Sequence, residues 1–289
     1  MSTSDSSGPA PRRVYFLSNR TAITAETLGH SLLAQFPELR FAPLTIPFID
    51  SPGKARKIVE RIESDARQTG LRPIVISTLA DEEISAIIHQ ADALILDPFD
   101  RFLPELEQEF HAASVHESGK SHRISNPTLY ESRIDAIDYA LIHDDGATTK
   151  QYSQADVIII GVSRSGKTPT CLYLALQFGI RAANYPITEE DMDSEDLPRH
   201  IKQYRNKLFG LTTDPRRLAR IREERRPGSL YASLEQCRKE LRAAEQLFEQ
   251  YRIPYVNTAD MSIEEIATKV VELAGLQRLS KPVLKHVDE

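Results

Sequence analysis

One short segment constrains the fold of this chain more than any other, because its residue types work only between a strand and a helix. Residues 161–168 read Gly-Val-Ser-Arg-Ser-Gly-Lys-Thr and match the pattern G-x-x-x-x-G-K-[ST] at every fixed position. Apolar β-branched residues fill positions 157–160, and residues 170–178 are compatible with a helix. The order of strand, loop and helix predicts a parallel α/β domain that carries a phosphate-binding loop.

The residue types of this loop suit the phosphates of a nucleotide. Glycine at its ends lets the backbone turn its N–H groups toward phosphate oxygens, and the following helix adds its positive N-terminal end. We expect Lys167 to contact the terminal phosphates and the hydroxyl of Thr168 to bind Mg²⁺. The predicted nucleotide-binding residues are Gly161, Val162, Ser163, Arg164, Ser165, Gly166, Lys167 and Thr168.

Strands alternating with helices upstream of the loop predict a parallel α/β domain of the doubly wound type. Downstream, the order of elements resembles the small nucleotide kinases among phosphate-loop proteins. A helix beginning at Pro127 is expected to present the apolar stripe Tyr130, Ile134, Ile137 and Leu141. The predicted organisation is a disordered tail at 1–12, an N-terminal α/β domain at 13–112, a connecting segment with a helix at 113–152, a P-loop, nucleotide-kinase-like α/β domain at 153–278, and a C-terminal tail at 279–289.

An arginine-rich stretch follows the strand that we predict at 207–212. By analogy with the nucleotide kinases, Arg222 and Arg225 are candidate catalytic residues that neutralise charge on a transferred phosphoryl group. The stretch reads equally well as a solvated helix, in which Glu223 and Glu224 offset part of the arginine charge. Fold analogy alone does not decide between the two interpretations.

Acidic residues that could serve the loop are few. No run of four apolar residues ending in Asp follows it, so the pattern offers no clear second ligand for Mg²⁺. The acidic pair at 144–145 closes a predicted helix and reads either as a solvated helix end or as part of a phosphate or Mg²⁺ site. We take Asp145 as a candidate catalytic residue, with Asp191 and Asp193 as alternatives for the group that accepts a hydroxyl proton.

Composition argues against several other classes of function. The net charge of −6 lacks the basic excess of a nucleic-acid-binding protein. No apolar run approaches the roughly 20 residues that span a bilayer, and residues 1–11 contain no apolar signal-peptide core. Cys171 and Cys237 are too few for a disulfide framework. We therefore expect a cytoplasmic protein without nucleic-acid or membrane partners, and a homodimer as the common default.

Several segments taken together closely resemble the phosphoenolpyruvate synthase regulatory proteins, bacterial relatives of the pyruvate, phosphate dikinase regulatory proteins. The resemblance runs from residue 13 to about residue 278, and one turn departs from it. Residues 18–21 read Ser-Asn-Arg-Thr where the family leads us to expect Ser-Asp-Gly-Thr. The segments that carry the resemblance are 21–26, 133–139, 143–146, 161–170, 182–186, 207–212 and 221–226.

The resemblance implies a bifunctional serine/threonine kinase and pyrophosphorylase. Such an enzyme uses ADP to phosphorylate and inactivate phosphoenolpyruvate synthase (pyruvate, water dikinase) on a threonine. It also removes that phosphate with inorganic phosphate as the acceptor, which releases pyrophosphate and restores the target. The implied ligands are therefore ADP, inorganic phosphate and Mg²⁺, and the implied nucleotide-binding segment is residues 161–168.

Two other functions stay open from the residues alone. One is a small-molecule P-loop kinase, which the C-terminal half by itself would suggest, although the large N-terminal domain argues against it. The other is a regulatory module that senses ADP without turnover, although the complete loop with Thr168 fits turnover better. Use of ADP rather than ATP would separate the regulator from the small-molecule kinase.

Overall fold

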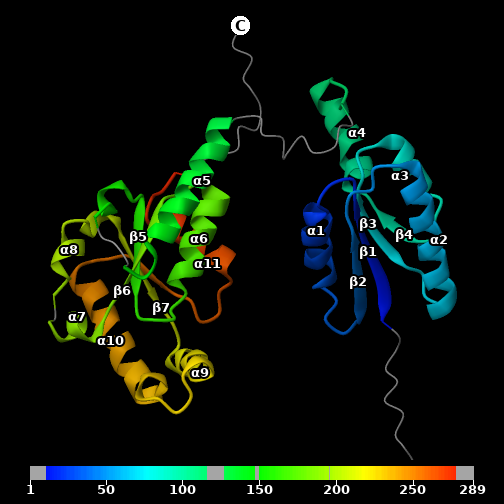
Figure 1. Ribbon diagram of the computed structural model, residues 1–289. Coiled ribbons are helices and arrows are strands. Elements are labelled where there is room, and N and C mark those ends of the chain that lie inside the picture. Colours follow the sequence, from blue (N-terminus) through cyan, green and yellow to red (C-terminus); the bar gives the residue numbers. More distant parts are fainter. Residues whose placement is uncertain (1–10, 116–126, 147–149, 195, 278–289) are drawn as a thin grey trace, which may run out of the picture. The chain divides into compact units, whose positions relative to one another are not determined.

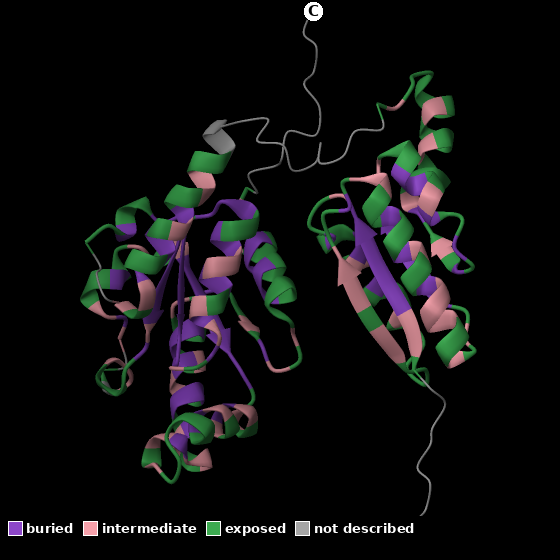
Figure 2. Cartoon of the chain, turned by 45° about the vertical axis from the view of Figure 1, so that its right-hand side comes forward, coloured by how far each residue is buried: buried purple, intermediate pink, exposed green. Residues whose placement is uncertain are grey.

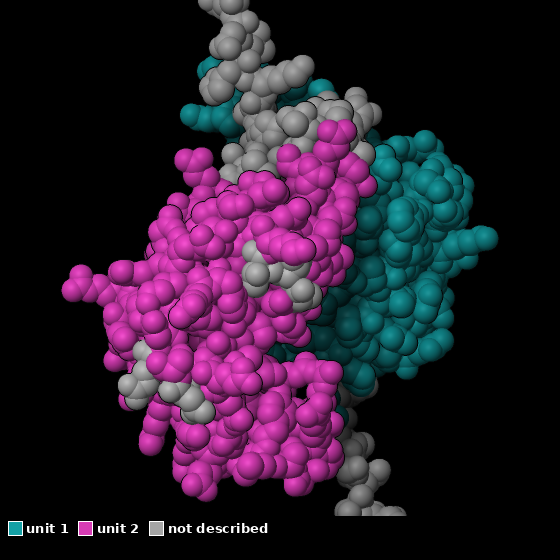
Figure 3. Space-filling model, turned by 60° about the vertical axis from the view of Figure 1, so that its left-hand side comes forward, with its two compact units in different colours: residues 1–123 teal, residues 124–289 magenta. Residues whose placement is uncertain are grey.

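The chain forms two compact α/β units in a computed structural model that describes residues 11–115, 127–146, 150–194 and 196–277 (Figure 1). The first unit comprises residues 1–123 and the second residues 124–289, coloured separately in Figure 3. Of the predicted tails, residues 1–10 and 279–289 lie outside the described residues. The parallel α/β class predicted for both halves of the chain is confirmed.

The first unit is a four-stranded parallel sheet with helices on both faces. Its strand order is β2-β1-β3-β4. Apolar side chains alternate between the faces, so that Val14 and Phe16 meet α1 while Tyr15 and Leu17 meet α2 and α3. The elements are β1 Arg12–Ser18, α1 Ile23–Leu33, β2 Phe41–Ile46, α2 Pro52–Thr69, β3 Ile74–Thr78, α3 Glu82–Ile88, β4 Leu94–Leu96 and α4 Pro98–Phe110.

The second unit repeats this strand order in a sheet of its own, β6-β5-β7-β8, in which every pairing is again parallel. Its strands are β5 Val157–Gly161, β6 Ala182–Pro186, β7 Leu208–Thr212 and β8 Tyr255–Asn257. Its α-helices are α5 Pro127–Ile142, α6 Lys167–Phe178, α7 Glu189–Asp193, α8 Arg199–Lys202, α9 Pro215–Arg225, α10 Leu234–Gln250 and α11 Ile263–Leu273. Short 3₁₀ turns lie at Asp144–Gly146, Tyr152–Gln154, Arg205–Lys207 and Leu230–Ala232.

Two apolar layers cover the sheet of the second unit, and its inner strands are buried, purple in Figure 2. Helices α5, α6 and α11 form the layer on one face, and α9 and α10 contribute to the other. Strand β7 carries Gly210, where an added Cβ would lie 2.7 Å from the ring of Phe248 on α10. The absence of a side chain at this position therefore lets α10 approach the sheet closely.

Helix α5 differs from its prediction in the face that it buries. It packs on α6 and belongs to the second unit. Ala136 and Ala140 are the buried residues that face α6, whereas Tyr130 and Leu141 of the expected apolar stripe are more than half exposed. Small side chains allow the two helices to approach closely, and a stripe identified by large apolar residues alone misses that face.

None of the helices in the described ranges has the length and apolar character needed to cross a membrane.

Candidate functional site

The glycine-rich loop leaves the carboxyl end of β5 and leads into α6, as the sequence predicts. Strand β5 is flanked by β6 and β7, so the chain moves to one side of β5 first and to the other side later. This reversal is a topological switch point, the place where open parallel sheets bind ligands beyond the carboxyl ends of their strands. The loop therefore lies where the fold favours a ligand.

Close packing explains the first glycine of the loop. A Cβ added to Gly161 would lie 2.4 Å from the carbonyl oxygen of Leu211 on β7 and 2.9 Å from the Oγ of Ser165. Gly166 has φ +96° and occupies the N-cap of α6, so no side chain there competes for the N–H groups of the first helical turn. Those N–H groups are the donors that bind anions at a helix N-terminus.

Lys167 is a buried cation at the start of α6. Only 4% of its surface is exposed, and its Nζ donates to the carbonyl oxygen of Val162 over 3.0 Å. Burial lowers the pKa of Lys167 to about 8, and the nearby carboxylate of Asp145 opposes that shift. The charged form of this lysine is therefore poorly compensated in the free protein and would gain from an anionic partner.

Thr168 forms a polar cluster with two residues from other elements. Its Oγ1 donates to the Oδ1 of Asp144 over 2.7 Å, and the Nδ2 of Asn184 donates to the same carboxylate oxygen. Asn184 lies on β6 with 1% of its surface exposed, and its Nδ2 is also 3.3 Å from the Oγ1 of Thr168. Three elements thus meet at the carboxylate of Asp144: strand β6, the turn after α5, and helix α6.

The cluster fits the Mg²⁺ expected beside a phosphate loop. A hydroxyl and a carboxylate side by side are the hard oxygen ligands that Mg²⁺ prefers, with water and phosphate oxygens filling its remaining positions. Within the described ranges, no group of three or more His, Cys, Asp or Glu side chains could hold a metal ion by itself. Thr168 and Asp144 are the residues that could hold Mg²⁺ beside bound phosphates.

Asp145, the predicted catalytic carboxylate, lies beside this cluster. Its backbone is left-handed, with φ 48°, and its N–H donates to the Oδ1 of Asn184 over 2.9 Å. Asp144 contacts Thr168 and Asn184, whereas Asp145 has different surroundings. Asp145 lines a cavity of about 460 Å³ over the loop, which we call the P-loop cavity. Its lining residues are Asp145, Ser163, Arg164, Gly166, Lys167, Thr168, Pro169, Ile221, Arg225, Arg226 and Tyr231.

The two arginines predicted on α9 occupy different environments. Arg225 is exposed and lines the P-loop cavity, so it can reach a phosphate bound there. Arg222 is fully buried beneath the loop, where its Nη2 donates to Glu240 over 2.6 Å and to the carbonyl oxygen of Ser163 over 3.0 Å. These are the contacts of a group that supports the loop, and a direct role of Arg222 at phosphate stays a prediction.

Sequence reasoning missed three residues of this site. Asp144 was recognised only as half of an acidic pair, and Asn184 carried no chemical signal within a strand. The hydroxyl of Tyr231 lies 2.9 Å from the Oγ of Ser163, and its ring packs 4.1 Å from the guanidinium carbon of Arg222. A lone tyrosine between two helices gives no sequence signal for such a contact.

The remaining expected site residues lie elsewhere. Asp191 accepts hydrogen bonds from the N–H and hydroxyl of Thr188 and caps α7, and the side chain of Asp193 is outside the described residues. The unusual turn at 18–21 belongs to the first unit, where the N–H of Arg20 donates to the Oγ of Ser18 over 3.1 Å. A role for that turn stays a prediction.

A parallel sheet whose inner strand leads through a glycine-rich loop into a helix defines the second unit as an α/β domain of nucleotide-kinase-like fold. Comparison with known proteins refines this class. The chain belongs to the kinase/pyrophosphorylase family, whose model matches residues 14–271.

Individual relatives match nearly the whole chain. A protein of Marinobacter nauticus is 51% identical, with 92% of this chain and 98% of the relative covered. One from Alkalilimnicola ehrlichii is 53% identical over 93% of this chain and 98% of the relative. One from Hahella chejuensis is 49% identical over 92% and 98%. All three are named "Putative phosphoenolpyruvate synthase regulatory protein".

Proposed function

We propose that this chain is a bifunctional regulator of phosphoenolpyruvate synthase. In one direction it transfers the β-phosphoryl group of ADP to a threonine of the synthase and leaves AMP. In the other it transfers the phosphoryl group from that threonine to inorganic phosphate and leaves pyrophosphate. The observation that carries the proposal is the P-loop cavity, which is lined by two cations, Lys167 and Arg225, and by the carboxylate of Asp145.

The forward reaction requires mainly positioning and neutralisation of charge. The N–H groups at the start of α6 and the ammonium of Lys167 would hold the phosphates of ADP, and Arg225 would face the transferred group. Bound Mg²⁺ would supply further neutralisation of phosphate charge. Asp145 would accept the proton of the threonine hydroxyl as its oxygen attacks phosphorus.

The reverse reaction fits the same groups. An oxygen of inorganic phosphate attacks the phosphorus of phosphothreonine, and the bond between phosphorus and the threonine oxygen breaks. Asp145 would accept the proton of the attacking inorganic phosphate and pass it to the threonine oxygen, and pyrophosphate leaves. The phosphoryl group of phosphothreonine would lie in the place of the β-phosphate of ADP and inorganic phosphate in the place of the α-phosphate, with Lys167 and Arg225 neutralising their charge, so one site serves both directions.

The choice of target rests on the relatives. Proteins about half identical over 92–93% of this chain carry a name that refers to regulation of phosphoenolpyruvate synthase. The match covers both units, including the first, which a small-molecule kinase would not need. This extent supports a protein target over a small metabolite.

A labelling assay tests the proposal. Purified phosphoenolpyruvate synthase is incubated with this protein and ADP labelled with ³²P in the β position, beside γ-labelled ATP freed of ADP. We expect label on a threonine of the synthase from ADP alone, and its release as pyrophosphate when inorganic phosphate is added. Label from ATP alone would replace the proposal with an ordinary kinase, and no label from either would favour a nucleotide sensor.

A further inference from the structure

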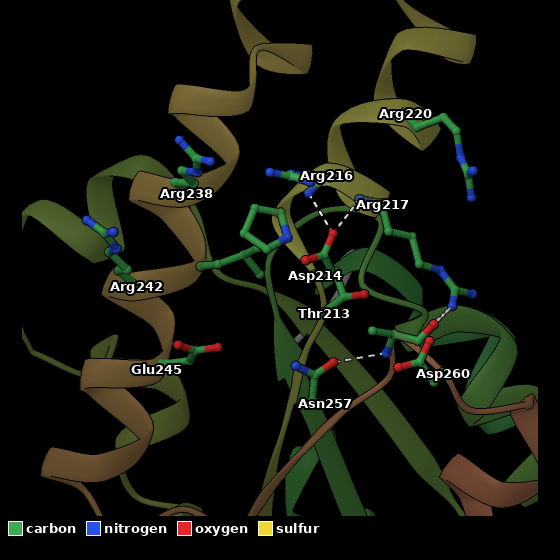
Figure 4. A pocket seen from close by; sticks show the side chains of 13 residues that line it. Thr213, Asp214, Arg216, Arg217, Arg220, Arg238, Arg242, Glu245, Asn257 and Asp260 are labelled. Carbon is green, nitrogen blue, oxygen red and sulfur yellow. Dashed lines mark hydrogen bonds between the residues drawn. The ribbon is translucent and has the colours of Figure 1, made fainter.

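A second cavity lies at the same edge of the sheet as the P-loop cavity, between the ends of β7 and β8 and the helices α9 and α10 (Figure 4). Its volume is about 1130 Å³. Arginine dominates its walls, with Arg216, Arg217 and Arg220 on α9 and Arg238 and Arg242 on α10. We call it the arginine cavity. The proposed reaction uses none of these residues.

The positive charge of the arginine cavity is only partly compensated. Five arginines face three lining carboxylates, Asp214, Glu245 and Asp260. Asp214 accepts the N–H groups of residues 216 and 217 as the cap of α9, and Glu245 accepts the hydroxyl of Thr212 over 2.5 Å. One oxygen of each of these two carboxylates therefore accepts hydrogen bonds from neutral donors, and the three carboxylates together compensate at most three of the five positive charges.

Four of the arginines take part in none of the ion pairs of the described part of the chain: Arg216, Arg220, Arg238 and Arg242. The protein as a whole is acidic, with a net charge of −6. A concave site with this density of guanidinium groups repels cations and attracts anions, and each guanidinium can bind a phosphate with two parallel hydrogen bonds. The missing partner of this cavity is therefore an anion with several charges.

The fifth arginine is held in place. Arg217 donates through Nη1 to the carbonyl oxygen of Ala259, and the same atom lies 3.4 Å from the carbonyl oxygen of Thr258. The Oγ1 of Thr258 donates to the carbonyl oxygen of Thr212 over 3.1 Å and also lies 3.4 Å from the carbonyl oxygen of Ser165 in the loop. One wall of the arginine cavity is thus fixed to the backbone and contacts the loop, so the site is adjacent to the P-loop cavity and partly preorganised.

Charge and size define the class of ligand. The nucleoside part of a P-loop-bound nucleotide carries no negative charge and does not account for five arginines. The cavity volume of about 1130 Å³ lies slightly above the range of small-molecule pockets, roughly 300–1,000 Å³, and leaves room for a hydrated anion with several charges. We propose that the arginine cavity is an accessory binding site for a small polyphosphate anion of the di- or triphosphate class, separate from the P-loop cavity.

Calorimetric titration with inorganic triphosphate at low salt tests this proposal on the whole protein. Three variants are compared with the natural chain. Arg238→Gln/Arg242→Gln alters the arginine cavity, and Lys167→Ala alters the P-loop cavity. Arg199→Gln/Arg205→Gln removes the same charge from exposed positions that line neither cavity. Melting temperatures verify that each variant is folded.

We expect two triphosphate sites in the natural chain and in the Arg199→Gln/Arg205→Gln control. The arginine-cavity variant should keep the P-loop site and weaken the accessory site at least about tenfold, as expected for loss of charge-assisted hydrogen bonds. Lys167→Ala should weaken the P-loop site and keep the accessory site. The titration involves no phosphoryl transfer, so its outcome is independent of the proposed enzymatic activity.

Three outcomes would overturn the proposal. One is a single triphosphate site that Lys167→Ala removes. Another is an arginine-cavity variant that binds triphosphate as before but ADP more weakly, which would assign the cavity to the nucleoside of the P-loop ligand. The third is an arginine-cavity variant that binds triphosphate as before but phosphorylates the protein target more slowly. That result would make the arginine cavity a binding site for an acidic segment of the target.

Discussion

The hydroxyl of Thr168 donates to the carboxylate of Asp144 over 2.7 Å, and this contact joins the helix after the P-loop to the turn after α5. Asp144 therefore occupies the position next to the predicted Mg²⁺ ligand, although it lies 24 residues earlier in the chain. A search for an aspartate at the end of an apolar strand downstream of the loop does not find it. The carboxylate reaches the site through tertiary packing of α5 on α6.

Asparagine substitutions at Asp144 and Asp145 distinguish the proposed Mg²⁺ ligand from the proposed proton acceptor. Asp144→Asn keeps the size of the side chain but removes the charge that attracts the cation, so we expect the Mg²⁺ concentration for half-maximal phosphorylation to rise about 10- to 100-fold. The matched variant is Asp145→Asn, which should lower the maximal rate and leave the Mg²⁺ requirement unchanged. Equal Mg²⁺ requirements in both variants would contradict these separate roles.

The strand, loop and helix of the P-loop could be predicted because their signals are local. β-branched residues, two glycines and a helical run follow one another within 22 residues, at 157–178. The contacts of Asp144 with Asn184 and Thr168 could not be predicted, because they depend on the turn at 144–146 lying against β6. No periodicity in the sequence encodes which turn meets which strand.

Helix periodicity predicts that Arg222 and Arg225 have different environments. Leu218 is buried, and Arg222 follows it by four residues on the same face of α9. Ile221 and Arg225 form a neighbouring row, which lines the P-loop cavity. Charge alone does not distinguish the arginines of this helix, whereas the spacing from Leu218 identifies Arg222 as the buried one.

Arg222→Met should destabilise the protein without acting at phosphate. The substitution leaves Glu240 buried without its cation, and breaking such a pair costs about 3–5 kcal/mol in the free energy of unfolding. Urea denaturation followed by the loss of helical signal measures this change. A fully stable Arg222→Met protein that lacks activity would instead make Arg222 a participant in the chemistry.

Arg225→Met should have the opposite effect. This side chain is exposed and lines the P-loop cavity, so its loss should change the free energy of unfolding by no more than about 0.5 kcal/mol. Phosphoryl transfer should fall about a thousandfold if Arg225 neutralises charge in the transition state. Single-turnover rates with saturating ADP measure the chemical step, and a rate close to that of the natural protein would exclude this role.

The lowered pKa of Lys167 predicts a pH dependence of ADP binding. The free protein loses the proton of this lysine as pH rises through about 8, whereas bound phosphates favour the charged form. Binding above pH 8 must therefore take up a proton, and the Kd for ADP should rise by up to about tenfold per pH unit. Phosphate groups titrate near pH 6, so measurements between pH 7.5 and 9.5 isolate the lysine.

Calorimetry in buffers of different ionisation enthalpy measures the proton uptake directly. The control is Lys167→Arg, whose guanidinium keeps its charge throughout this pH range and should give an ADP affinity that is independent of pH. A natural protein whose ADP affinity is also flat between pH 7.5 and 9.5 would mean that the free lysine is charged there.

Substitution of Gly161 should affect both folding and nucleotide binding. The new Cβ of Gly161→Ala would lie 2.4 Å from a backbone carbonyl oxygen of β7, which cannot move without disturbing the sheet. We expect a loss of about 1–3 kcal/mol in the free energy of unfolding and at least a tenfold rise in the Kd for ADP, because the loop must shift. Gly210→Ala is the matched control in the same sheet, since the atoms nearest to its Cβ would belong to the Phe248 side chain, 2.7 Å away, and not to the backbone. That variant should lose stability and retain the ADP affinity of its folded fraction. If both variants keep normal ADP affinity, the position of the loop does not depend on close contact with β7.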